Sequence, residues 1–202
     1  MSLKFQFWYD FASPYSFLSA MRIEELSSAS GIEVEWRPFL LGPIFKSQGW
    51  ETSPFNIYDA KGRYMWRDMA RRSAGYGIAF RKPSEFPRNG VLASRIALAF
   101  GSHARRVEFS KLVFGANFSD DRDISDEPVV ASLLKNMGED PERIISFAQS
   151  EDNRGKLRSA TDEAAGCGIF GAPSFLAGDE LFWGDDRLED ALEWFVRARE
   201  SS

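Results

Sequence analysis

The run FQFWYDFASPYSF, residues 5–17, constrains the fold more than any other stretch of the chain. Its first part, Phe5 to Tyr9, is short and rich in aromatic residues, which predicts a buried β-strand. Ser13 and Pro14 then suit the N-cap and the first residue of a helix, because Ser accepts a free backbone N–H and Pro has no N–H to leave unpaired. Taken alone, the run predicts a strand, a turn and a capped helix, and it leaves open whether Ser13 does more than cap.

The segments after this run predict a parallel βαβ unit. Residues 14–29 place apolar side chains on one broad face of a helix, and Gly31 follows where that helix should end. Residues 32–39 alternate as a half-buried strand does. A strand, helix and strand in this order form a right-handed crossover by default.

The end of the chain returns to α/β patterning, and a helical stretch separates the two parts. Residues 169–176 and 181–183 predict two strands joined by a turn at Gly178, and a helix follows with apolar residues at i, i+3, i+4 and i+7. We expect residues 1–42 and 156–202 to form one α/β domain and residues 43–155 to be inserted into it. The insertion should hold a helix over 58–74 and then helices ending near Gly101, Gly115 and Gly138.

Composition excludes several classes of function. The net charge of −5 argues against a nucleic-acid partner, and no run approaches about 20 consecutive apolar residues, so we expect no membrane span and a cytoplasmic protein. Cys167 is the only Cys and His103 the only His. These counts exclude an intrachain disulfide and a Cys-x-x-Cys pair, and we expect no metal site. An enzyme of this composition should depend on a cofactor or cosubstrate for its reactive group.

Three motifs together resemble a known family. Asp10-Phe-Ala-Ser-Pro-Tyr15 occupies the place of the redox Cys-x-x-Cys in a thioredoxin fold, with Ser13 at the first Cys. Gly168-Ile-Phe-Gly-Ala-Pro173-Ser-Phe resembles the cis-proline loop of that fold. With Phe182-Trp-Gly-Asp-Asp-Arg187, the chain resembles the 2-hydroxychromene-2-carboxylate isomerases of the DsbA superfamily, relatives of the kappa-class glutathione transferases. The resemblance implies a thioredoxin-like domain with a large all-helical insertion, and a homodimer.

The resemblance also implies glutathione as cofactor and a set of contacts for it. Ser13, at a helix N-terminus, would stabilise the cofactor's thiolate. The cofactor's backbone would pair at Ala172, before a cis Pro173, and the last helix would bind the γ-glutamyl group. The implied cofactor contacts are Ser13, Asn56, Lys61, Ala172, Pro173, Trp183, Gly184 and one of Asp185 or Asp186. The implied substrate contacts are Phe11, Tyr15, Lys46 and Asn89. Each of Lys46, Asn56, Lys61 and Asn89, taken singly, also fits a solvated surface residue.

The implied reaction is an isomerisation of a small aromatic substrate. The glutathione thiolate would add to a cyclic hemiketal acid and open its ring, and it would leave after rotation about the freed bond, giving a trans-alkenyl pyruvate. Two other functions stay open: a kappa-class-like transferase that conjugates electrophiles, and a non-catalytic module that binds glutathione or a peptide. The missing Cys pair argues against a disulfide oxidoreductase.

Overall fold

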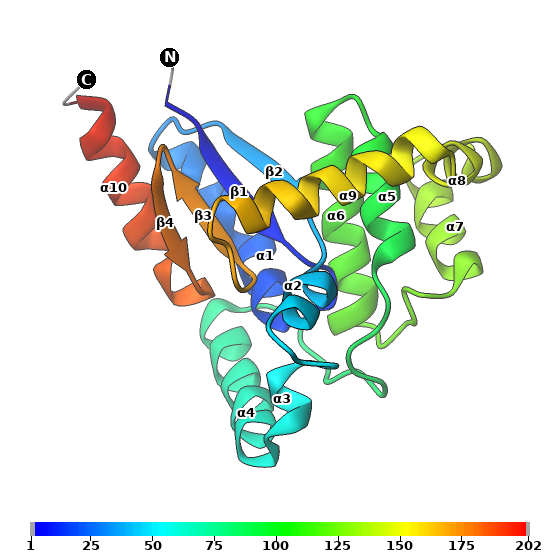
Figure 1. Ribbon diagram of the computed structural model, residues 1–202, viewed down its shortest axis with the longest axis horizontal. Helices are drawn as coiled ribbons and strands as arrows, with labels where there is room; N and C mark the ends of the chain where they lie inside the picture. The colour runs from blue at the N-terminus through cyan, green and yellow to red at the C-terminus, as the bar shows by residue number, and fades with distance from the viewer. Residues whose placement is uncertain (1–2, 201–202) are drawn as a thin grey trace.

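The computed structural model describes residues 3–200, within which four strands form one mixed sheet (Figure 1). The strand order is β2-β1-β3-β4, with β1 parallel to β2 and antiparallel to β3, and β3 antiparallel to β4. The strands are β1 (Phe5–Tyr9), β2 (Val34–Pro38), β3 (Ser174–Ala177) and β4 (Glu180–Trp183). This βαβ and ββα arrangement confirms the thioredoxin-like architecture.

Helices cover both faces of the sheet. The side chains of β1 alternate, so Phe5, Phe7 and Tyr9 enter the larger core while Trp8 enters a smaller core on the opposite face. On the larger-core side lie α1 (Pro14–Ala29) and α10 (Leu188–Glu200), which follows a short 3₁₀ turn, η1 (Asp185–Arg187). The opposite face is covered by α2 (Leu41–Ser47) and by α9 (Glu151–Gly166), which crosses in front of the sheet in Figure 1.

The segment between α2 and α9 is mostly helical, as predicted. It contains α3 (Pro54–Ile57), α4 (Asp59–Tyr76), α5 (Val91–Ala99), α6 (His103–Phe118), α7 (Glu127–Asn136) and α8 (Pro141–Ala148). In Figure 1, α5 to α8 lie beside the sheet, and α3 and α4 project from the lower end of the molecule. The prediction that a helix ends at Gly115 is wrong, because Gly115 lies inside α6. Gly115 lacks the positive φ found at Gly138, so its backbone continues the helix to Phe118.

The sheet and the helical segment share one core. Phe114 of α6 places its ring 5.8 Å from that of Tyr9 and 5.0 Å from that of Phe11. The predicted boundary between residues 155 and 156 falls within α9. Over residues 3–200, none of the helices combines the length and the apolar character needed to cross a bilayer.

Candidate functional site at the start of helix α1

Ser13 is the N-cap of α1 and also contacts the loop before β3. Its backbone is extended (φ −85°, ψ 115°), and its Oγ accepts the N–H of Ser16 at 3.1 Å. The same hydroxyl donates to the carbonyl oxygen of Ala172 at 2.8 Å. The Ala172–Pro173 peptide bond is cis, as the sequence predicted. The hydroxyl therefore joins two motifs that are 159 residues apart.

The turn between β1 and Ser13 is held by Asp10, a residue that we did not single out from the sequence. Its carboxylate accepts the N–H of Ala12 at 2.8 Å and the N–H of Leu41 at 2.7 Å, and its carbonyl accepts the N–H of Ser13 at 2.9 Å. The side chain is buried, and this burial raises the pKa of Asp10 although the two hydrogen bonds act in the opposite direction. An Asp beside a turn that precedes a cap is the one sequence signal that could have suggested this role.

Tyr15 connects the first turn of α1 with α3 and α4. Its hydroxyl donates to Asp68 Oδ2 of α4 at 3.0 Å, and its ring centroid lies 6.3 Å from that of Phe55 in α3. Burial and the negative charge of Asp68 raise the pKa of Tyr15. Tyr15 is partly exposed, so its ring is available as the predicted aromatic wall.

The predicted polar contacts Asn56 and Lys61 also lie on α3 and α4. Asn56 is exposed beside Phe55, and its amide donates to the carbonyl of Phe86 at 3.3 Å. Lys61 is exposed on α4, seven residues before Asp68. A spacing of seven residues returns to the same helix face about 10 Å further along the axis. Lys61 therefore lies on the face of α4 that contacts Tyr15.

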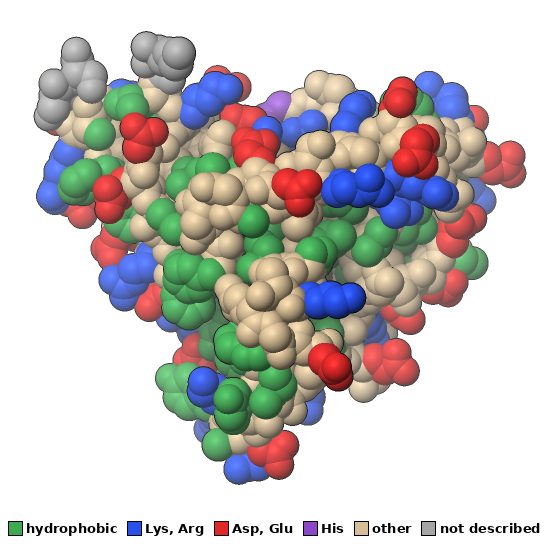
Figure 2. All heavy atoms as spheres, in the orientation of Figure 1, with side chains coloured by type: hydrophobic (Ala, Val, Ile, Leu, Met, Phe, Trp, Pro, Cys, Tyr) green, Lys and Arg blue, Asp and Glu red, His purple; other side chains and the backbone are tan. Residues whose placement is uncertain are grey.

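The start of the last helix lies against the cis-proline loop. Gly184, with φ 111°, donates its N–H to the carbonyl of Pro173 at 3.0 Å. Trp183 is 53% exposed, and its ring lies 4.8 Å from that of Phe170, which is 44% exposed. Figure 2 shows hydrophobic side chains gathered between this end of the hairpin and the α3–α4 lobe.

The structure separates the two acidic candidates at this helix start. The carboxylate of Asp185 is buried and accepts hydrogen bonds from Ser19 Oγ at 2.8 Å, Arg72 Nη2 at 2.6 Å and Arg22 Nη1 at 3.3 Å. Burial raises the pKa of Asp185, and these donors partly offset that effect. Asp186 has a 53% exposed side chain paired with Arg187. Only Asp186 has a carboxylate that is accessible to a ligand.

The other three predicted substrate contacts, Lys46, Asn89 and Phe11, differ in exposure and in hydrogen bonding. Lys46 is exposed on α2 and forms no ion pair with a residue in the range 3–200. Asn89 is exposed, and its Oδ1 accepts the N–H of Val91, the first residue of α5, at 2.9 Å, so this oxygen already has a partner. Phe11 is fully buried between Tyr9 and Phe114, so it does not line an accessible surface and we correct that prediction. The aromatic character of the motif is needed there for the core.

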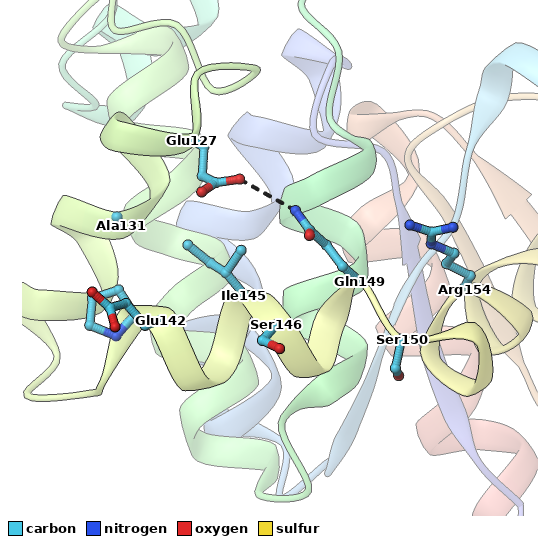
Figure 3. Close-up of a pocket in the computed structure, with 9 residues that line it drawn as sticks. Glu127, Ala131, Glu142, Ile145, Ser146, Gln149, Ser150 and Arg154 are labelled. Atoms are coloured by element: carbon cyan, nitrogen blue, oxygen red, sulfur yellow. Dashed lines mark hydrogen bonds between the residues drawn. The ribbon is translucent and has the colours of Figure 1, made fainter.

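A hollow on the insertion lies on different elements from these residues. It is lined by α7, α8 and the start of α9, with Glu127 accepting a hydrogen bond from Gln149 at 3.3 Å (Figure 3). None of the predicted site residues lines it. In the part of the chain that the structure describes, no cluster of three or more His, Cys, Asp or Glu side chains has the arrangement of a metal site.

The chain is similar to known proteins over nearly its whole length. The chain is 27% identical to a 2-hydroxychromene-2-carboxylate isomerase of Sphingobium xenophagum over 197 residues, which covers 97% of this chain and 99% of the relative. It is 23% identical to a glutathione S-transferase kappa 2 of Caenorhabditis elegans, covering 95% of this chain and 91% of the relative.

Among solved structures, a 2-hydroxychromene-2-carboxylate isomerase superposes with a TM-score of 0.87 at 24% identity, over 98% of each chain. The family described as DSBA-like thioredoxin domain matches residues 4–194, nearly the whole chain. The protein therefore belongs to the DsbA-like thioredoxin domain family.

Proposed function

We propose that the protein is a glutathione-dependent isomerase that converts 2-hydroxychromene-2-carboxylate, or a related cyclic aromatic hemiketal acid, to the trans-alkenyl pyruvate. The observation that carries the proposal is the position of the Ser13 hydroxyl, at a helix N-terminus and 2.8 Å from the Ala172 carbonyl of the cis-proline loop. The name of the isomerase relative supports this reaction, and the name of the kappa transferase relative supports glutathione as the cofactor.

The residues around Ser13 fit a thiol-bearing peptide. The N-terminus of α1 favours a negative charge, and the Ser13 hydroxyl is a donor that forms no disulfide with the thiol it holds. In the structure this hydroxyl donates to Ala172, so its hydrogen is already committed. A peptide N–H arriving at the Ala172 carbonyl would replace that bond, and the hydroxyl hydrogen, which rotates freely, would turn toward sulfur. The Ser13 hydroxyl would thus lose a neutral hydrogen bond to Ala172 and form a stronger, charge-assisted hydrogen bond to the thiolate.

Other residues of the chain would bind the rest of glutathione and the substrate. Asp186 and the backbone N–H groups at the start of η1 would hold the γ-glutamyl end of glutathione, whose acceptor and donor groups they complement. Asn56 and Lys61 would contact the cofactor from α3 and α4, and Lys46 would bind the carboxylate of the substrate. Bound glutathione would supply the nucleophilic thiolate. Tyr15 would present an aromatic wall to the substrate.

A kappa-class-like transferase is the second candidate, because the chain aligns with the C. elegans relative over nearly its full length. A transferase would consume one glutathione for each molecule of 1-chloro-2,4-dinitrobenzene, whereas an isomerase would return the glutathione unchanged. Measuring glutathione consumption during turnover of each substrate separates the two. Tight glutathione binding without turnover of either substrate would favour a binding module.

The role of Ser13 is tested by Ser13→Ala. We expect the pKa of bound glutathione to rise by about one to two units toward the ~8.5 of a free thiol, because a hydrogen bond to a charged group is worth roughly 1.5–3 kcal/mol. Turnover at neutral pH should fall steeply, while glutathione affinity should change less. The measurement is thiolate absorbance of the bound cofactor against pH.

A matched control is Ser150→Ala, which removes the side-chain cap of α9, where Ser150 accepts the N–H of Asn153. Both variants should lose about 0.5–2 kcal/mol of stability, but only Ser13→Ala should shift the thiol titration. An unchanged titration curve in Ser13→Ala would reduce Ser13 to a cap. Calorimetry that gives no heat at millimolar glutathione would contradict the proposed cofactor.

A further inference from the structure

Asp10 is a buried carboxylate in an unusual position. Asp10 is 5% exposed, and it forms no ion pair with any residue between 3 and 200. Removing an ionised carboxylate from water costs several kcal/mol unless its oxygens are well paired. Within residues 3–200, the Asp10 carboxylate accepts hydrogen bonds only from two backbone N–H groups, those of Ala12 and Leu41. These two residues belong to different segments of the chain.

Each of these two partners belongs to a segment of the proposed site. Ala12 immediately precedes Ser13, whose own N–H donates to the Asp10 carbonyl. Leu41 is the first residue of α2, the helix that carries Lys46. The N-cap of α2 is Leu40, which has no side chain able to accept a hydrogen bond. The Asp10 carboxylate therefore supplies the cap that the sequence of α2 lacks, and it adds negative charge at a helix N-terminus.

We propose that Asp10 is a positioning residue that fixes α2 against the turn bearing Ser13, and so sets the separation between the cofactor sulfur and the cation that binds the substrate carboxylate. This inference rests on the proposed function. Both Asp10 oxygens must accept, at 2.8 and 2.7 Å. An Asn side chain offers one acceptor, and its NH₂ would face the second N–H donor. A carboxylate is therefore the group that suits the position.

The chain offers a variant that removes a single hydrogen bond of this link. Leu41→Pro removes the N–H that Asp10 accepts together with the Leu side chain, and Pro is well tolerated at the first residue of a helix. Leu40 already has the extended backbone that Pro requires of its predecessor, with φ −116° and ψ 123°. Leu41→Ala keeps the N–H but truncates the same partly buried side chain. Comparison of the two variants isolates the hydrogen bond from the packing.

Turnover is measured with glutathione and two electrophiles, 2-hydroxychromene-2-carboxylate and the uncharged 1-chloro-2,4-dinitrobenzene. We expect Leu41→Pro to raise KM for the carboxylate substrate about tenfold over Leu41→Ala, the equivalent of one hydrogen bond to a charged group. Activity toward the uncharged electrophile and glutathione affinity should agree within about twofold between the two variants. Asp10→Asn should show the same KM effect and also raise the pKa of bound glutathione, since it releases Ala12 as well.

Hydrogen exchange gives a readout that does not require turnover. In Leu41→Pro, exchange should rise at the non-proline residues of 42–47 and also at those of 10–16, relative to Leu41→Ala. Equal KM values in the two variants, or faster exchange confined to residues 42–47, would overturn the positioning role. If the wild type binds glutathione but isomerises nothing, the proposed function fails, and the exchange comparison alone then decides whether Asp10 couples the two segments.

Discussion

Asp185 and Asp186 are neighbours in sequence but differ in what their carboxylates do. Asp186 is half exposed beside Arg187, so Asp186→Asn should leave the melting temperature unchanged. If Asp186 holds the amino group of glutathione, the variant should weaken glutathione binding about tenfold, because it removes a charged acceptor. Calorimetric titration with glutathione measures the change. An unaltered dissociation constant would remove Asp186 from the site.

Asp185→Asn, unlike Asp186→Asn, should lower the stability of the protein. It leaves Arg22 and Arg72 beside a neutral amide in a buried position, and breaking a buried ion pair in this way costs about 3–5 kcal/mol. Chemical denaturation should show the loss. The sequence could not distinguish these two Asp residues, since the donors that occupy Asp185 lie 163 and 113 residues away in the chain. By contrast, the capping role of Ser13 depends on adjacent residues and could be predicted.

At the scale of elements, the irregular segment between α4 and α5 is held in place by Arg88. Its guanidinium is 3% exposed and donates to Asn117 Oδ1 at 3.2 Å, to the carbonyl of Arg122 at 2.9 Å, and to the carboxylate of Asp121. The amide of Asn117 in turn donates to the carbonyl of Phe11, at the turn before Ser13. The Arg88 cluster thus connects this segment with the candidate site.

The pH dependence of this cluster can be predicted from Asp121. Hydrogen bonds from the Ser84 N–H and from Arg88 lower the pKa of Asp121 to about 2. A lowered pKa stabilises the folded state above the unfolded value near 3.8, and this stabilisation is lost as the pH falls toward 2. Asp121→Asn should abolish that part of the pH dependence and keep the backbone, since Asn tolerates the φ of 56° found here. Denaturation midpoints from pH 2 to 7 measure it; parallel curves for the two proteins would contradict the prediction.

The elements differed in how well the sequence specified them. The helix predicted over 14–29 is α1, and β1 has the predicted bounds, because aromatic alternation and an N-cap are local signals. The helices α2 and α3 were not predicted. Gly42 and Pro43 are weak helix formers, and the hydrogen bond to the first residue of α2 comes from Asp10, 31 residues away. A short helix stabilised by a distant side chain leaves little trace in its own sequence.

At the scale of the whole molecule, the thioredoxin-like sheet and the helical insertion are joined by aromatic packing. The ring of Phe114, from α6, lies 5.8 Å from that of Tyr9, 5.0 Å from that of Phe11 and 6.5 Å from that of Phe17. The chain contains eighteen Phe residues, and which of them lie in the core depends on contacts between distant segments. Phe11 is the clearest case, because its place beside Ser13 in the motif favoured a ligand contact while Phe114 buries it.

This shared core predicts that the sheet and the insertion unfold together. Phe114→Ala should cost about 3–5 kcal/mol through lost burial and the cavity that remains. Far-UV circular dichroism follows mainly the helices, and tryptophan fluorescence includes the buried Trp8 and Trp36 of the sheet. We expect both denaturation curves to shift equally and to coincide. Phe147→Ala, at a 49% exposed position on α8, is the control and should change stability by less than about 1 kcal/mol. A dichroism transition that moves while the fluorescence transition stays in place would show that the two parts fold as separate units.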